Sequence, residues 1–179
     1  MNLARISRTI GMTVAAGAIA LTAVPAASAD TAAAPIGCFN GWIGAWANNR
    51  LVSAELDWEG AGYGALLART ATAKEGDWEQ FEICLGSKYD TIRSLASSRY
   101  VSVEVDYTGS QKSMLRARAT AVGPWEKFDV VCRTNSYCTI KSLENDKYVS
   151  VADSTVLRAT STSIVFDAKF GIEHQDQMD

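Results

Sequence analysis

An eleven-residue pattern recurs along this chain, and the recurrence restricts the possible folds more than any other feature of the sequence. Residues 93–103 and 141–151 are identical at six of the eleven positions, and two further positions only exchange arginine for lysine. A more divergent copy lies at residues 45–55, in which Asn48-Asn49-Arg50 aligns with Ser97-Ser98-Arg99, so successive copies are offset by 49 and 48 residues. A unit repeated at such a period cannot bury its own apolar face, so the three copies are expected to share one core.

Each copy predicts four strands connected by turns and loops. Residues 100–105 alternate polar or aromatic side chains with valine, which is typical of a half-buried strand. Phe81 alternates with Ile83, and the other copies repeat this step, which indicates one buried face on the last strand. Tight turns are predicted at three equivalent pairs of small polar residues, at 48–49, 97–98 and 145–146. Twelve strands in three sequential units favour an all-β fold, a closed pseudo-threefold barrel with a hairpin cap, over a propeller, which usually needs more blades.

The second copy contains three motifs that the other copies repeat in part. They are arginine or lysine before Tyr-Val-Ser-x-Glu at residues 99–104, Leu-Arg-Ala-x-Ala-Thr-Ala at 115–121, and Trp-Glu-x-Phe-x-hydrophobic at 125–130. Together these motifs resemble the fascin-like branch of the β-trefoils. The resemblance extends over residues 38–173 and implies a β-trefoil fold. It implies little about function, because trefoils include lectins, inhibitors, growth factors and actin-bundling proteins.

The first 29 residues have the features of a secretory signal peptide. Arg5 and Arg8 give a positive start, residues 10–24 form an uncharged and mostly apolar run, and Ala27-Ser28-Ala29 supplies the small-residue pattern at the cleavage site. This run of 15 residues is shorter than the roughly 20 that span a bilayer as a helix, so a cleaved signal is favoured over a membrane anchor. The sequence therefore predicts a secreted, extracellular protein that does not insert into a membrane after cleavage.

The remaining chain is expected to form a single domain. A short leader at 30–37 precedes the domain at 38–173, and a polar tail follows at 174–179. The expected repeats are at about 38–88, 89–136 and 137–173. Removal of the signal lowers the formal net charge from −3 to −5, because it removes two arginines and no acid. A mildly acidic surface without blocks of like charge argues against nucleic acid as a partner.

All four cysteines lie in the exported part of the chain, where an even number usually forms disulfides. Four cysteines allow three pairings. Cys132 and Cys138 flank a short polar stretch, which favours a disulfide that closes it and leaves Cys38 to pair with Cys84. A metal site is the alternative, but the only histidine is near the end of the chain and the spacings match no zinc pattern.

Catalysis and cofactor binding find little support in this sequence. A nucleophile activated by histidine would require His174, which lies in a tail expected to be loosely ordered. Pairs of acids could hydrolyse glycosides, but the acids recur at equivalent positions of two copies, Glu55 with Glu104 and Glu79 with Glu126. A catalytic pair needs two different environments, so recurrence indicates a structural role. The sequence predicts a protein that is not an enzyme and needs no cofactor.

Three tryptophans are assigned to the structure. Trp78 and Trp125 each precede a core phenylalanine at the same step, which favours packing at the entrance of a strand over sugar binding. Trp46 aligns with Leu95 and Leu143, and it is therefore expected to be an enlarged core residue.

The candidate binding residues are Asp57, Trp58, Asp106 and Tyr107. They form two acid-aromatic pairs in glycine-rich or polar loops that are longer than a strand connection requires, whereas residues 152–155 of the third copy form a short connection without an aromatic. Long loops on a rigid scaffold are common recognition sites. The alternative is that the two rings fold back over the end of the barrel.

These observations lead to a lectin-like, carbohydrate-binding module as the first functional hypothesis. An aromatic face can stack on a sugar ring while a carboxylate accepts hydrogen bonds from its hydroxyls. The rival is a protein-binding trefoil, such as a protease inhibitor or a cell-surface interaction factor, which would present one asymmetric loop. The expected partner is accordingly a glycan or an extracellular protein.

Overall fold

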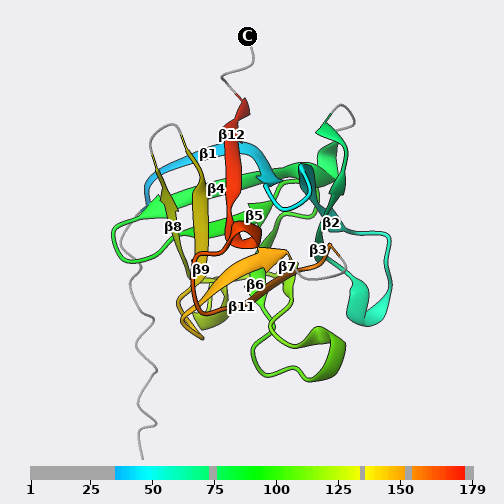
Figure 1. The fold of residues 1–179 in the computed structure, drawn as a ribbon. Helices are drawn as coiled ribbons and strands as arrows, with labels where there is room; N and C mark the ends of the chain where they lie inside the picture. The colour runs from blue at the N-terminus through cyan, green and yellow to red at the C-terminus, as the bar shows by residue number, and fades with distance from the viewer. Residues whose placement is uncertain (1–34, 73–75, 134–135, 152–154, 176–179) are drawn as a thin grey trace, which may run out of the picture. The chain divides into compact units, whose positions relative to one another are not determined.

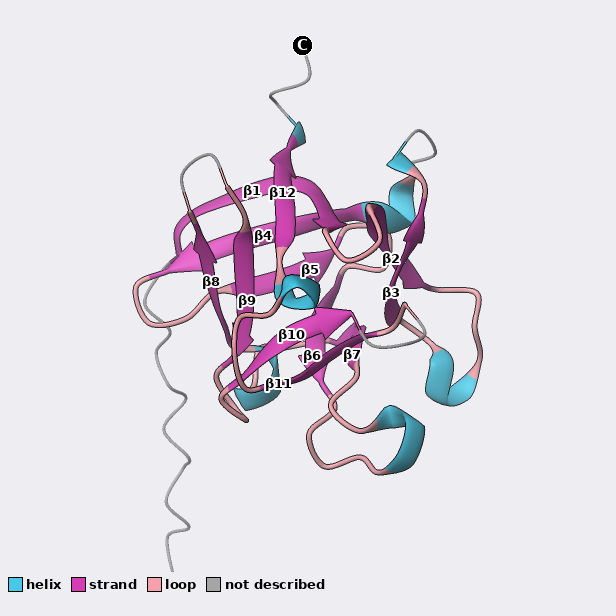
Figure 2. Cartoon of the chain, viewed as in Figure 1, coloured by secondary structure: helices cyan, strands magenta, loops and turns pink. Residues whose placement is uncertain are grey.

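The computed structural model describes residues 35–72, 76–133, 136–151 and 155–175, and the predicted signal peptide lies outside these residues. Within them, the chain forms twelve antiparallel strands (Figures 1 and 2). The strands of the first copy are β1 (Pro35–Ala45), β2 (Arg50–Glu55), β3 (Ala65–Thr70) and β4 (Gln80–Gly86). Those of the second are β5 (Thr91–Ser94), β6 (Arg99–Val103), β7 (Leu115–Ala119) and β8 (Phe128–Cys132). Those of the third are β9 (Cys138–Ser142), β10 (Lys147–Val151), β11 (Leu157–Ser161) and β12 (Phe170–His174).

Short 3-10 turns connect several of these strands (Figure 2). In the described residues they are η1 (Gly60–Gly62), η3 (Asp77–Glu79), η4 (Gly109–Gln111), η5 (Pro124–Glu126) and η6 (Phe166–Ala168). No helix in this part of the chain is both long and apolar enough to cross a membrane.

Six strands close into a ring in the order β1, β4, β5, β8, β9 and β12. Between copies, β4 pairs with β5, β8 with β9, and β12 with β1. Within the copies, β1 pairs with β4, β5 meets β8 through the bridge between Asp90 and Phe128, and β9 meets β12 through Cys138 and Phe170. This ring is the closed barrel that the repeat predicts.

The other six strands form three hairpins, β2–β3, β6–β7 and β10–β11, which together make the predicted cap. Each hairpin is joined to the next by a backbone hydrogen bond, from Ala117 N to Gly64 O, from Ala159 N to Ser113 O, and from Ala68 N to Thr155 O, at 2.7 to 2.9 Å. All three accepting residues have positive φ, between 54° and 73°. At Gly64 a Cβ atom would lie 2.6 Å from the carbonyl oxygen of Ala117, so this close approach favours glycine.

The core contains one phenylalanine from the last strand of each copy: Phe81, Phe128 and Phe170. All three are fully buried. The alternation predicted for this strand is therefore confirmed. The predicted turns are confirmed as well, because their second residues, Asn49, Ser98 and Asp146, all adopt the left-handed conformation, with φ between 53° and 58°.

The alternation predicted for residues 100–105 is only half right. Val101 and Val103 are buried, but Ser102 and Glu104 on the opposite face are fully buried too. The polar face is buried because its groups have partners: Ser102 Oγ donates to Glu126 at 2.5 Å, and Glu104 accepts hydrogen bonds from Arg118. A strand of this kind is buried on both faces although its sequence alternates.

The prediction that Trp46 is a core residue is wrong. Trp46 follows the last residue of β1, at the start of the turn, and 41% of it is exposed. Its ring contacts Tyr137 at a centroid distance of 5.7 Å and the exposed Phe166 at 6.4 Å. Its equivalent in the third copy, Leu143, is 43% exposed, so this position of the repeat lies outside the core.

The structure contains the disulfides Cys38–Cys84 and Cys132–Cys138, the pairing that the spacing favours.

The strands extend slightly beyond the expected domain limits. β1 begins at Pro35, inside the expected leader, and β12 ends at His174, the first residue of the expected tail. His174 is ordered by stacking on Phe39, with the ring centroids 3.8 Å apart.

Candidate functional site

The two acid-aromatic pairs lie in two equivalent loops. The first long loop, residues 56–64, connects β2 to β3, and the second long loop, residues 104–114, connects β6 to β7. Each contains a 3-10 turn. Asp57 and Asp106 are exposed, as are Trp58, at 44%, and Tyr107, at 37%. The structure thus places all four candidate residues at the surface, two in each loop.

Trp58 rests on the backbone of its own loop. A Cβ atom at Gly62 would lie 2.9 Å from Cε3 of the indole ring. The absence of a side chain at Gly62 therefore lets the indole pack closely over the 3-10 turn while almost half of Trp58 remains in solvent.

Tyr107 is oriented by two residues outside its loop. Its ring meets the edge of Trp125 at a centroid distance of 6.5 Å and an interplanar angle of 72°. The guanidinium carbon of Arg118 lies 5.8 Å from the Tyr107 centroid and 5.9 Å from that of Trp125. Trp125 is half-buried, so its structural role includes supporting a candidate binding residue. The sequence interpretation missed this contact, although the recurrence of tryptophan at this position was visible.

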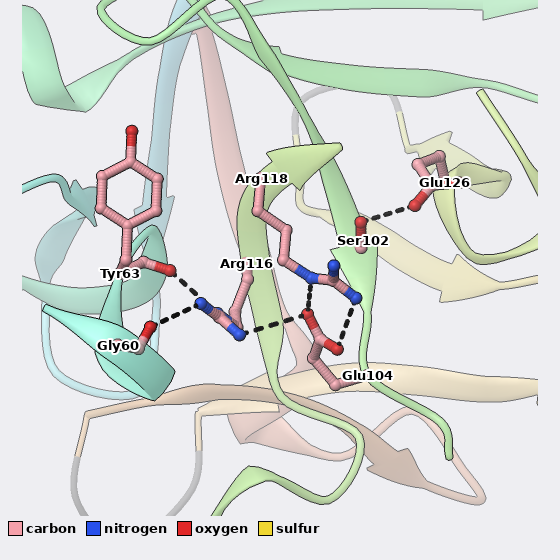
Figure 3. Close-up of polar contacts among 7 residues, drawn as sticks. All are labelled: Gly60, Tyr63, Ser102, Glu104, Arg116, Arg118 and Glu126. Carbon is pink, nitrogen blue, oxygen red and sulfur yellow. Dashed lines mark hydrogen bonds and ion pairs between the residues drawn. The ribbon is translucent and has the colours of Figure 1, made fainter. Parts of the chain in front are cut away.

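A buried ion pair anchors the start of the second long loop (Figure 3). Glu104 is fully buried, and Arg118 donates to both of its carboxylate oxygens, one bond measuring 2.9 Å. Arg116 Nη1 lies 3.8 Å from the same carboxylate. The hydrogen bond to Glu104 raises the pKa of Arg118, while burial opposes the increase, so the guanidinium remains charged.

The first copy repeats this pair and the third copy lacks it. Arg69 donates to Glu55 at 2.5 and 2.7 Å, and Ser53 Oγ donates to the same carboxylate at 2.7 Å. The third copy has Ala152 and Thr160 at the two positions in its sequence. The ion pair therefore occurs only in the copies that have a long loop.

The other two recurring acids close the 3-10 turns before the last strands. Glu79 accepts hydrogen bonds from Gly76 N and Thr70 Oγ1, both at 2.8 Å. Glu126 accepts one from Gly123 N at 2.7 Å, in addition to that from Ser102 (Figure 3). All four recurring acids thus have structural partners, as their recurrence predicts.

An arginine from the following copy holds each long loop. Arg116 of β7 donates to the carbonyl oxygens of Tyr63, at 2.8 Å, and Gly60, at 3.2 Å, in the first long loop (Figure 3). Arg158 of β11 donates in the same way to Lys112 and Ser110 of the second, at 2.8 and 2.5 Å. We call Arg116 and Arg158 the loop arginines.

The equivalent residue in the first copy is Leu67, which pairs with Val156, just after the short third connection. The loop arginines therefore accompany the long loops. The Leu-Arg-Ala motif in two of three copies was the available signal in the sequence, but the motif does not reveal that its arginine reaches into another copy.

Replacing Arg158 with leucine, the residue that the first copy has at this position, should loosen the second long loop. The variant loses two hydrogen bonds, each worth about 1 kcal/mol. The amides of Lys112 and Met114, which are bonded within the loop, should then exchange about tenfold faster or more. Hydrogen exchange of the first long loop should not change and serves as the internal control. Unchanged exchange in both loops would show that Arg158 does not hold the loop.

Comparisons with known proteins reveal likeness in structure but not in sequence. No protein-family model and no curated protein match the chain. ThreeFoil, a designed threefold-symmetric protein, superposes with a TM-score of 0.60 at 14% identity, covering 74% of this chain and 96% of ThreeFoil. The Rhizoctonia solani agglutinin does so with a TM-score of 0.61 at 13% identity, covering 78% and 97%. A ricin B-like lectin from Macrolepiota procera, solved in complex with lactose, has a TM-score of 0.58 at 12% identity, covering 75% and 94%.

The structural neighbours are not restricted to lectins. An endo-β-galactosidase from Clostridium perfringens superposes with a TM-score of 0.60 at 9% identity, covering 75% of this chain and 32% of the enzyme. Identities this low show the fold alone. The resemblance to the fascin-like branch stays a prediction. The six-stranded ring, the three capping hairpins and the solved neighbours together establish that this chain has the β-trefoil fold.

Proposed function

We propose that this protein is a secreted, non-catalytic carbohydrate-binding protein in which each long loop forms one sugar subsite. The observation that carries the proposal is the repeated display of an acid beside an exposed aromatic on a loop held at both sides. Asp57 with Trp58 and Asp106 with Tyr107 occupy equivalent places, and both loops have a loop arginine and an ion pair with a buried carboxylate.

This arrangement suits a sugar for two reasons. The apolar face of a pyranose can stack on an indole or phenol ring, and the adjacent carboxylate can accept hydrogen bonds from its hydroxyls. The loop arginines and ion pairs fix the loops before a ligand arrives, so less conformational entropy is lost on binding. The agglutinin and the lactose-bound lectin among the structural neighbours add support for a glycan as the class of ligand.

Each of the recurring acids is engaged in a structural contact within one copy, which argues against a catalytic role for them. Two disulfides agree with export to an oxidising compartment. The rival function, protein binding through one rigid loop, accounts less well for two loops with the same acid-aromatic pair.

The test replaces each aromatic with alanine. Trp58→Ala and Tyr107→Ala should each weaken glycan binding by about 2- to 13-fold, which corresponds to the 0.5–1.5 kcal/mol of an aromatic contact. The unfolding midpoint should hardly change, because both rings are at the surface. The double variant should lose far more binding to a multivalent glycan, because two subsites act through effective concentration. A glycan array on the oxidised mature protein supplies the ligand, and titration measures each variant.

The matched control is Phe166→Ala, since Phe166 is an aromatic with 56% exposure outside both long loops. Its glycan affinity should equal that of the parent. If the loop variants unfold early and bind as before, the rings are covers of the barrel end. If no glycan binds the parent, the carbohydrate hypothesis fails, and inhibition of a panel of proteases would support the rival.

A further inference from the structure

The three copies close the barrel wall in three different ways. In each copy, the first and last strands meet in the barrel wall, and we call the line along which they meet a seam. In the first copy β1 pairs with β4 over seven residue pairs. In the second copy β5 and β8 meet only at Asp90 and Phe128, and in the third β9 and β12 meet only at Cys138 and Phe170. Among the described residues, only the first seam is therefore a long ladder.

The two disulfides lie differently with respect to the seams. Cys38–Cys84 joins β1 to β4 directly across the first seam, and the first half of β1 pairs along β4. Cys132–Cys138 instead joins β8 to β9. Just before β9, Arg133 N donates to Tyr137 O and Ser136 N donates to Arg133 O, so these residues form the turn of the β8–β9 hairpin. One disulfide thus crosses a seam, and the other lies in a hairpin beside a seam.

In the second copy, a side chain occupies the seam. The buried carboxylate of Asp90 accepts hydrogen bonds from Gly86 N at 2.9 Å and Val130 N at 2.6 Å. Burial raises the pKa of Asp90, and the two amides oppose that increase. Cys138 has the equivalent position in the third copy, but its sulfur is held in the disulfide. The amide of Ile172, which is equivalent to that of Val130, has no such acceptor among the described side chains.

Within the described residues, the edge of β12 that faces the third seam is therefore open beyond Phe170. Trp46 N donates to Lys169 O at 3.1 Å, so by strand alternation Gly171 and Glu173 direct their backbone groups towards β1. Ile172 and His174 then direct theirs to the opposite side. On that side, in the described part of the chain, β12 pairs only at Phe170. An open strand edge is a template for another strand.

A groove of about 980 Å³ runs along this edge, and residues of β12, the β8–β9 hairpin, β1 and β4 line it. Trp46 lies beside Gly171 at one end of the edge, and the stacked rings of Phe39 and His174 lie at the other. Arg133 lines the groove from the hairpin and is exposed. The groove thus combines main-chain groups that are unpaired among the described residues with apolar rings, the cation of Arg133 and the exposed acid Glu173.

We propose that this groove binds an extended peptide segment, which adds to β12 as a strand through the backbone groups of Ile172 and His174. The first copy supports a strand as the occupant, because a strand fills the equivalent seam there. The rings at Trp46 and Phe39 suit apolar side chains of the peptide, and Arg133 suits an acidic one. This site is separate from the long loops, and it stands or falls independently of glycan binding.

The test uses a phage-displayed library of random peptides of about ten residues, the length of a long strand. Selection on the oxidised mature protein should enrich apolar peptides with an acidic residue. Ile172→Pro removes the outward amide without removing a bond to β1, and it should weaken the selected peptides about tenfold or more. Arg133→Glu should weaken them as well. Leu143→Ala, which changes an exposed apolar residue outside the groove and the long loops, is the matched control and should bind them like the parent.

Hydrogen exchange of the parent protein tests the same proposal without a variant. In the free protein the amides of Ile172 and His174 should exchange freely, and saturating peptide should slow them about tenfold or more. The proposal is overturned if these amides are already protected, if no peptide is enriched, or if enriched peptides leave them unprotected. Displacement of the peptide by a glycan from the array, with no protection by the peptide, would assign the groove to sugar instead.

Discussion

Replacing Phe128 with alanine lowers the free energy of unfolding by about 3–5 kcal/mol, the usual range for a buried phenylalanine. The ring is fully buried in the core that all three copies share, so its removal leaves a cavity that no single copy can fill. Phe81→Ala and Phe170→Ala should fall in the same range, because these rings have equivalent positions and are also fully buried. Denaturant unfolding with an unchanged m-value measures the effect.

Phe166→Ala serves as the control for this series as well. With 56% of Phe166 exposed, its loss should cost less than about 0.5 kcal/mol. A cost below about 1 kcal/mol for Phe128→Ala would contradict the burial of that ring.

Replacing Arg118 with threonine, the residue at this position in the third copy, should cost about 3–5 kcal/mol. The change leaves the carboxylate of Glu104 fully buried and removes the arginine that donates a hydrogen bond to each of its oxygens. Arg116, at 3.8 Å, is too distant to replace those bonds, because hydrogen bonds of this kind require about 3 Å. Chemical denaturation of the parent and the variant gives the difference.

The sharper measurement is a double-mutant cycle that introduces the residues of the third copy. Adding Glu104→Ala to Arg118→Thr removes the stranded carboxylate, as in the pair Ala152 and Thr160. The double variant should therefore be more stable than Arg118→Thr alone. Costs that simply add would mean that the two side chains do not depend on each other, contrary to their contact in the structure.

The fold could be predicted because its evidence is local and repeated. The motifs of residues 93–103 recur in the third copy, and each copy has turn residues and a core phenylalanine at the same steps. The disulfides followed from the short stretch between Cys132 and Cys138. Trp46 was wrongly predicted to be a core residue because its alignment with leucine shows only that the position is apolar. Whether such a residue is buried depends on the direction in which its side chain points from the turn.

The candidate site could be predicted only in part, because its supports act between copies. The two long loops and their four candidate residues could be recognised in the sequence because these loops are longer than a connection between two strands requires. The loop arginines were not, since Arg116 binds Tyr63 across 53 residues and nothing within one copy reveals that distance. The open edge of β12 was hidden for the same reason, because the length of the pairing across a seam is a property of the assembled barrel.

The support of each loop by the next copy has a consequence for engineering a trivalent protein. Grafting a long loop onto residues 152–155 would not by itself create a third subsite, because the first copy has Leu67 where an arginine is needed. The graft must be accompanied by Leu67→Arg, a change about 85 residues earlier in the chain at a residue that pairs with Val156. Each subsite in this fold thus requires a long loop in one copy and an arginine in the next copy. A single copy transferred to another protein would therefore lack the arginine that holds its loop.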